Sequence, residues 1–219
     1  MSLDKELDQL HLLMDKDFLN DEDIEILRYL SFHKNDEVRC NVAKALINAD
    51  TEKAEQILLL LLDDKSYLVR ADACDSLCFN SNPQVLVLLK KIVAKDRVGL
   101  VRSYAVMSIG DIALTINSDK QKLLLFLEQR LLVEKCKHTK ISFFRTMYIL
   151  GAEKYLRCLI EQLKNVRYQH RCATINALRE VVTNENKSEI VEAFKELQKT
   201  EKTAAVKSSI ERVLGEITQ

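Results

Sequence analysis

The sequence is poor in the residues that interrupt helices. Its 219 residues include one proline, Pro83, and only four glycines. Proline and glycine supply the tight turns of hairpins and the flexible loops that bind phosphate groups. Their scarcity therefore argues against a β-rich fold and against a glycine-rich nucleotide loop. It favours a chain of consecutive helices that are joined by short turns.

The sequence also lacks a net charge and a long apolar run. Lysine and arginine together number 33, as do aspartate and glutamate, so no global field attracts the chain to DNA or to a membrane. The longest apolar run, residues 57–62, is far too short to span a bilayer. The first residues lack the basic leader and apolar core of a secretory signal. We therefore expect a cytoplasmic protein that makes no use of a membrane.

Clusters of metal-binding residues are missing as well. The four histidines stand far apart in the sequence and none is followed by glutamate. The six cysteines lie within helical patterns, and Cys74 and Cys78 share a helix face without a histidine or a second cysteine pair nearby. We therefore expect free, buried thiols, no metal and no cofactor.

What the sequence does contain is a repeat. Four segments share a β-branched residue, a cation, small or apolar residues three or four positions later, and a large aliphatic residue at the seventh position. They begin at Val38-Arg39, Val69-Arg70, Val101-Arg102 and Val206-Lys207. The three arginines recur at intervals of 31 and 32 residues, which is a solenoid period. The spacing within each segment places the apolar residues on one buried helix face.

The whole chain divides into helical pairs on this basis. We predict an N-terminal capping helix at about 3–14 and helical pairs at about 20–47, 51–78, 83–116, 119–150, 153–182 and 187–218. Each pair exposes an apolar stripe that only a neighbour can cover, so the pairs must stack. We predict an all-α fold, a right-handed superhelix of about six pairs, and a single domain over residues 1–219. In this scheme Gly151 matches Gly110, and Phe143 stands where Arg102 stands.

The pattern Asp-x-x-x-x-Val-Arg, followed by alanine and a late Leu or Ile-Gly, resembles the HEAT repeat, especially its short bacterial form. The match is close over residues 64–77 and 96–110 and weak in the fourth and fifth pairs. The resemblance implies that the turn aspartate and the following arginine form a structural ladder between neighbouring repeats. This carries over to Asp64 with Arg70 and to Asp96 with Arg102. For Asp36 and Arg39 the spacing is shorter and the equivalence stays open.

Helix geometry predicts which side chains point away from the core. Counted from each arginine of the ladder, positions −1, +3, +4 and +7 share the buried face, whereas positions +2, +5 and +9 point the opposite way. The resemblance implies that the second helix of each pair lines a concave groove. The groove positions of the first unit of this kind are Asn41, Lys44 and Asn48. The candidate partner-binding residues that follow are Asp72, Asp75, Phe79, Tyr104, Met107 and Asp111 and, by the glycine alignment, Arg145 and Tyr148.

This predicted groove combines exposed aromatic residues and methionine with carboxylates, as a protein or peptide site does. The preferred hypothesis is a non-catalytic scaffold or adaptor that binds a protein or peptide partner there. An alternative is that tight curvature packs these side chains against one another. The sequence specifies neither the partner nor the oligomeric state.

Two other functions are open at this point. The basic stretch 135–179 suggests nucleic-acid or anion binding, with Lys164, Arg167 and Arg171 as candidates. HEAT-like DNA glycosylases use tryptophans and a catalytic aspartate, and this chain has no tryptophan. The repeat motif is also shared with HEAT-like phycobilin lyase subunits, so a lyase-type or repair-type enzyme is a further alternative. Because no base, nucleophile or oxyanion donor accompanies Asp72 and Asp75, we predict no catalysis.

Overall fold

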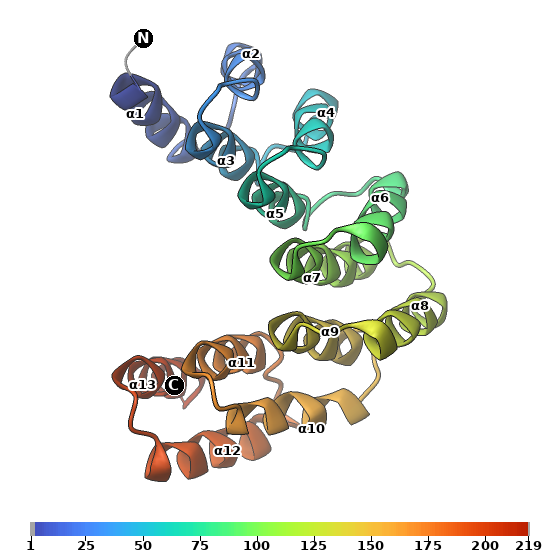
Figure 1. Cartoon of the computed structure of the whole chain (residues 1–219), viewed down its shortest axis with the longest axis vertical. Helices are drawn as coiled ribbons and strands as arrows, with labels where there is room; N and C mark the ends of the chain where they lie inside the picture. Colours follow the sequence, from blue (N-terminus) through green and yellow to red (C-terminus); the bar gives the residue numbers. More distant parts are fainter. Residues whose placement is uncertain (1–2, 219) are drawn as a thin grey trace. The chain divides into compact units, whose positions relative to one another are not determined.

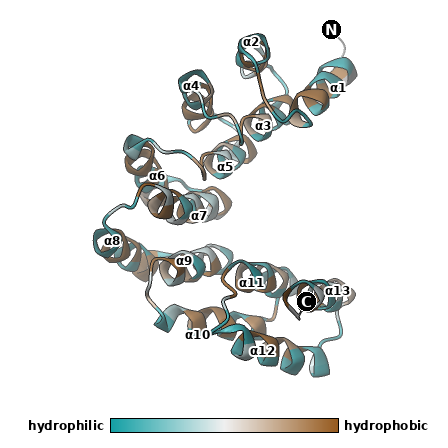
Figure 2. Ribbon diagram, turned by 180° about the vertical axis from the view of Figure 1, so that it is seen from behind, coloured by the Kyte–Doolittle hydropathy of each residue, from teal (hydrophilic) through white to brown (hydrophobic). Residues whose placement is uncertain are grey.

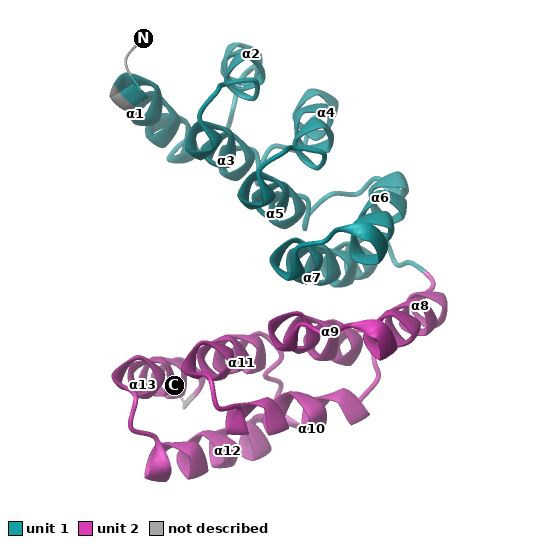
Figure 3. Ribbon diagram, viewed as in Figure 1, with its two compact units in different colours: residues 1–118 teal, residues 119–219 magenta. Residues whose placement is uncertain are grey.

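The computed structural model describes residues 3–218, and within that range its regular structure is entirely helical (Figure 1). The helices group into two compact units that divide between Ser118 and Asp119 (Figure 3). We call them unit 1 and unit 2 and describe each by itself. The expected all-α helical-repeat fold is confirmed, whereas the single domain stays a prediction.

Unit 1 contains the N-terminal capping helix and the first three helical pairs. They are α1 (Leu3–Met14), α2 (Asp21–Leu30), α3 (Asp36–Ala45), α4 (Glu52–Leu61), α5 (Tyr67–Ser76), α6 (Pro83–Lys95) and α7 (Gly99–Thr115). The odd-numbered helices form one row, in which α1 packs on α3, α3 on α5 and α5 on α7 (Figure 1). The even-numbered helices form a second row that covers one side of the first.

The even-numbered helices of unit 1, which form its outer row, begin at well-formed caps. Asn20 accepts a hydrogen bond from the backbone N–H of Asp23, and the Asp23 carboxylate accepts one from the backbone N–H of Asn20, which together make a capping box. Thr51 caps α4 through the N–H of Ala54. Pro83 opens α6, where its missing N–H costs nothing because the first turn has no partner for it.

The core of unit 1 lies where the two rows meet. The residues at positions −1, +3, +4 and +7 are inaccessible to solvent, as helix geometry predicts. They are Val69, Ala73, Cys74, Leu77, Val101, Ala105, Val106 and Ile109. Figure 2 shows the consequence, because apolar and polar residues occupy different sides of most helices. The small residues at +3 let the helices of the row approach closely.

Unit 2 repeats this plan with different residues. Its elements are α8 (Lys120–Val133), α9 (Lys137–Ile149), α10 (Lys154–Glu161), a 3-10 turn η1 (Gln162–Lys164), α11 (Tyr168–Glu180), α12 (Lys187–Thr200) and α13 (Ala204–Thr218). Helices α9, α11 and α13 pack in a row, and α10 and α12 cover it (Figure 3). Large side chains such as Phe194, Leu159 and Ile175 fill its core.

Two sequence-based expectations need correction. Gly151 does not correspond to Gly110, because Gly110 lies inside α7 whereas Gly151 has a φ of 102° and ends the turn that follows α9. The N–H of Gly151 and that of Ala152 bond back to the carbonyls of Tyr148 and Met147, which is a glycine C-terminal cap. The register assigned to α9 on that basis was therefore wrong.

The second correction concerns the cysteines. Only Cys40 and Cys74 are fully buried, and the other four are partly accessible, although all six are free thiols. Burial raises the pKa of Cys40 to about 12 and that of Cys78 to about 11, so neither thiol is activated. Within residues 3–218, no helix combines the length and the apolar character needed to cross a membrane.

Candidate functional site

The arginines of unit 1 join each repeat to the next. Arg39 donates from Nε to Asp64 Oδ2 at 2.6 Å and from Nη2 to Asp64 Oδ1 at 2.8 Å. Arg70 makes the same two contacts with Asp96, at 2.8 and 3.3 Å. Each arginine therefore binds the turn aspartate of the following repeat, and not the aspartate that precedes it in its own turn. Arg39, whose place in the ladder the sequence left open, is a full member.

The same arginines also hold their own turns. Nη1 of Arg39 donates to the carbonyl of His33 at 2.6 Å, and Nη1 of Arg70 donates to that of Asp64 at 2.8 Å. Arg102 does likewise with the carbonyl of Asp96 at 2.9 Å. Burial alone would raise the pKa of Asp64, but the hydrogen bonds from Arg39 and from the N–H of Ser66 leave that pKa below its ordinary value.

The other predicted residues of unit 1 gather on one surface. We call the surface formed by Asp72, Asp75, Phe79, Tyr104, Met107 and Asp111 the inner face. All but Phe79 are half-buried, and Phe79 is 65% exposed. They come from α5, α7 and the residues just after α5, which pack side by side.

Charge on the inner face is predominantly negative. Burial raises the pKa of the Tyr104 hydroxyl, and the nearby carboxylates of Asp75 and Asp72 raise it further. Helices α5 and α7 pack side by side, so the tyrosine and both carboxylates lie on one surface. Lys44 on α3 lies 3.5 Å from Asp72, and that lysine is half exposed. The structure thus brings the aromatic and acidic candidates of α5 and α7 together.

Two hollows that the sequence did not single out lie near this surface. A hollow of about 190 Å³ lies beside Phe79 and is lined from the ends of α3 and α5, including Ile47 and Asn80. Across the turn that follows α3, a second hollow of about 180 Å³ includes Phe18, which is 76% exposed. Phe18 follows the end of α1 and Phe79 follows the end of α5. This shared position after an odd-numbered helix is the feature of the sequence that could have indicated both residues.

The chain is similar to known helical-repeat proteins in sequence and in fold. A family model described as HEAT repeats matches residues 24–110. Residues 24–110 are HEAT repeats. A search of curated proteins finds no match. Among solved structures, a chain from the complex of CpcE and CpcF of phycocyanin lyase from Nostoc sp. PCC7120 shares the fold, with a TM-score of 0.64 and 16% identity over 99% of this chain and 91% of that chain.

The ladder continues in unit 2 with a different acid. Arg171 donates from Nε and Nη2 to the two carboxylate oxygens of Glu201, at 2.7 and 2.9 Å, and from Nη1 to the carbonyl of Asn165 at 2.7 Å. The hydrogen bond from Arg171 is the main reason that the pKa of Glu201 falls to about 2. Arg171 is thus committed to a carboxylate and is not an anion-binding residue, contrary to the sequence-based hypothesis. Lys164 and Arg167 are exposed.

Arg145 and Tyr148 do not form part of an open groove. Arg145 is 9% exposed, and its Nε donates to Glu180 at 2.7 Å. The Tyr148 hydroxyl accepts a hydrogen bond from Asn186 at 2.8 Å. Both side chains therefore contribute to the internal cohesion of unit 2. The incorrect glycine alignment explains the prediction for Tyr148 only. Arg145 is also five residues after Lys140, which is the fourth residue of α9 as Arg70 is of α5, and it is its pairing with Glu180 that covers it.

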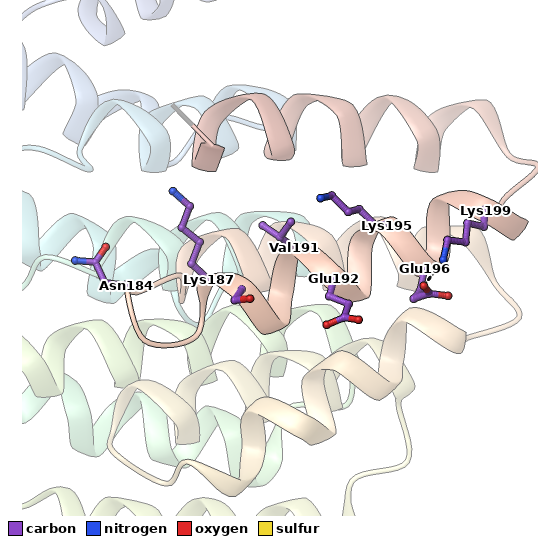
Figure 4. A pocket seen from close by; sticks show the side chains of 8 residues that line it. Asn184, Lys187, Val191, Glu192, Lys195, Glu196 and Lys199 are labelled. Carbon is purple, nitrogen blue, oxygen red and sulfur yellow. Dashed lines mark hydrogen bonds and ion pairs between the residues drawn. The ribbon is translucent and has the colours of Figure 1, made fainter.

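A wider hollow, of about 660 Å³, runs along α12 (Figure 4). Figure 4 shows that lysine and glutamate side chains alternate on it, and Lys199 pairs with Glu196. Opposite charges on a single helix offer little selectivity, and Val191 is its one apolar side chain. Among residues 3–218, no group of three or more His, Cys, Asp or Glu residues is arranged to hold a metal ion.

Proposed function

We propose that the inner face of unit 1 binds a basic segment of a partner protein and that the protein acts as a non-catalytic scaffold. The observation that carries this proposal is the juxtaposition of Tyr104 with the carboxylates of Asp72 and Asp75, next to the exposed ring of Phe79. Aromatic side chains provide much of the binding energy of protein interfaces, and carboxylates select and steer a positively charged ligand.

Two features support binding over catalysis. The thiols next to this surface, Cys40 and Cys78, have raised pKa values, and Tyr104 is held in its neutral form, so none of the three is a ready nucleophile. HEAT repeats are also a scaffold architecture whose stacked units present extended surfaces for partners. The solved structure that shares the fold is itself a complex of two proteins.

The test uses a double variant, Tyr104→Ala with Asp75→Lys, at two half-buried positions outside the core. Affinity capture from the source cell, followed by mass spectrometry, identifies the partner, and calorimetry with the purified partner measures the affinity. We expect the variant to fold and to lose at least tenfold in affinity. An equally tight complex would show that the inner face is not the site.

A matched control places the same kinds of change on the outer row. Val87 on α6 is 59% exposed and Glu52 on α4 is exposed, so Val87→Ala with Glu52→Lys removes an apolar side chain and reverses one charge. This control should bind the partner as the wild type does. Loss of binding in both variants would indicate a general effect of charge and would contradict a specific inner face.

A lyase-type role is the second candidate, and the shared fold with a phycocyanin lyase subunit favours it. The two candidates separate in an assay of lyase activity on phycocyanin, performed with the purified protein alone and with its captured partner. Under the scaffold hypothesis neither sample is active. Activity that is lost in the Asp75→Lys variant would instead assign a catalytic role to the inner face.

A further inference from the structure

Among the turns that precede α5, α7, α9, α11 and α13, the ladder has one neutral position. The residue two before the cap of α3, α5, α7, α9, α11 and α13 accepts a hydrogen bond from the backbone N–H of that cap residue. Before α3 this residue is His33, whose other ring nitrogen lies 3.3 Å from the carboxylate of Glu6. The acids in this role are Asp64, Asp96, Glu134 and Glu201. At the start of α11 the same role falls to Asn165, which accepts from the N–H of Arg167 at 3.3 Å. Between α9 and α11 the ladder therefore has an amide where the turns before α5, α7, α9 and α13 have a carboxylate.

Two histidines meet beside this neutral position. His138 is in the first turn of α9 and His170 in the first turn of α11, and their ring centroids are 6.1 Å apart. Nδ1 of His170 lies 3.1 Å from Oδ1 of Asn165. An amide oxygen only accepts, so this hydrogen bond puts the proton on Nδ1 and leaves Nε2 for another partner.

The surroundings of the two rings are positive. Burial lowers the pKa of His138, and burial together with His138, Arg167 and Lys137 lowers the pKa of His170. Lys137 and Arg167 are exposed, and neither forms a salt bridge in the described part of the chain. Cations in the first turn of a helix are opposed by its dipole, so two adjacent helices carry unfavourable charge here.

The nearby acids are engaged elsewhere. The carboxylate of Glu134 accepts from the N–H of Cys136, Glu201 binds Arg171, and Glu180 binds Arg145. Each of these acids has its own partner at hydrogen-bond distance, and none of them contributes to the pKa of either histidine. A bound anion would supply the negative charge that a ladder carboxylate supplies at the other turns.

We propose that Lys137, His138, Arg167 and His170 form a site for a single phosphoryl-type anion at the neutral position of the ladder. The ligand oxygens would accept hydrogen bonds from the Arg167 guanidinium and from the ring nitrogens of protonated histidines. The two histidines would take up protons as the anion binds, so binding strengthens as the pH falls through their pKa values.

A single phosphoryl group fits this site better than a nucleic-acid strand. A strand needs a continuous track of free cations. Four cations spread along the basic stretch are paired with carboxylates and interrupt such a track: Lys154 with Glu128, Arg145 with Glu180, Arg171 with Glu201 and Arg179 with Glu216.

The test measures the binding of inorganic phosphate and of sulfate to the whole protein by proton NMR of the histidine rings. The sequence has four histidines, so His138→Gln and His170→Gln assign their signals. We expect these two signals to shift with ligand while those of His11 and His33 do not. Sulfate keeps its charge between pH 8 and pH 5.5. We therefore expect its affinity to rise at least tenfold over this range, which corresponds to a rise of one unit in a histidine pKa when sulfate binds.

A variant pair separates this site from general attraction of anions. Arg167→Gln should weaken sulfate binding at least tenfold at pH 5.5, whereas Lys195→Gln on α12, at an exposed lysine of the wide hollow, should leave it unchanged. Circular dichroism checks that both variants fold. If the natural ligand is a phosphorylated side chain, phosphoserine should bind as tightly as phosphate does. If the natural ligand is the free ion, phosphate should bind and phosphoserine should not.

Three results would overturn the proposal. The first is a set of ligand-induced shifts that all four histidines share, and the second is an affinity for sulfate that does not depend on pH or on Arg167. The third is an affinity for single-stranded oligonucleotides that exceeds that for phosphate and increases with length. The last outcome would assign the basic stretch to nucleic acid.

Discussion

Unit 1 and unit 2 join their repeats by the same contact with different residues. In unit 1 the contact is regular, because Arg39 binds Asp64 and Arg70 binds Asp96. In unit 2, which lies outside the match to the HEAT family model, Arg171 binds Glu201 in the same bidentate manner. The comparison shows that an arginine held between a turn carbonyl and a carboxylate joins repeats in both units, and that either aspartate or glutamate can provide the carboxylate.

The largest expected effect in this comparison is at Arg39. Its side chain is 5% exposed and binds both oxygens of Asp64, so Arg39→Ala leaves a nearly buried carboxylate without its partner. We expect the free energy of unfolding of unit 1 to fall by about 3 kcal/mol. Urea denaturation followed by circular dichroism measures this loss.

Arg70→Ala is the natural companion to that variant. Arg70 is more exposed, at 17%, and one of its contacts with Asp96 is long at 3.3 Å, so we expect a smaller loss and a melting temperature lower by a few degrees. Equal stability of the wild type and both variants would show that the ladder is incidental to the fold.

How far the sequence predicts this ladder depends on the turn that precedes each arginine. Asp64 and Asp96 stand six residues before Arg70 and Arg102, so the motif is visible there. The turn before Arg39 has no acid at that distance, because His33 occupies it. Arg39 still joins the ladder, since its carboxylate comes from the next repeat and its own turn contributes only a carbonyl.

The sequence predicted which residues share a surface only in the helices whose register it predicted correctly. Positions counted from Arg70 and Arg102 led to the inner face, with Asp75 and Tyr104 on it. Positions counted from Gly151 failed, because a glycine in a helix interior and a glycine that ends a helix look alike in sequence but have different backbone conformations. The histidine pair could not be found in this way, since His138 and His170 meet only through the packing of α9 on α11.

Glu201 in unit 2 is the counterpart of the ladder aspartates of unit 1. The pKa of Glu201 in the folded protein is about 2, below its ordinary value of 4.5, because the carboxylate binds Arg171. A carboxylate with a lowered pKa stabilises the fold fully above its unfolded value, and this contribution is lost as the pH falls through the folded value. Stability of unit 2 should therefore fall between about pH 4.5 and pH 2 through this group.

Glu201→Gln tests this directly. The variant should be less stable than the wild type at neutral pH, and the difference should shrink between pH 4.5 and pH 2, as denaturation at a series of pH values would measure. Thr200→Ala, next to it on the exposed end of α12, serves as the control with an unchanged pH profile. A constant difference across this pH range would contradict an ionised Glu201 in the folded protein.

The smallest expected effect comes from completing the ladder. Asn165→Asp places a carboxylate where Asp64, Asp96, Glu134 and Glu201 stand in the other turns, 3.1 Å from Nδ1 of His170 and next to Arg167. A partly exposed charge pair of this kind adds about 0.5 kcal/mol, so the gain in stability should be slight. The sharper readout is the pKa of His170, which should rise because the new carboxylate favours the protonated ring. The variant should also bind sulfate more weakly, because the site then contains its own negative charge.

Asn165→Ser, which lacks both the charge and the amide, should leave the pKa of His170 well below that in the aspartate variant. If the aspartate variant instead keeps the low pKa of His170 and binds sulfate as the wild type does, the neutral position of the ladder has no part in setting the charge between α9 and α11.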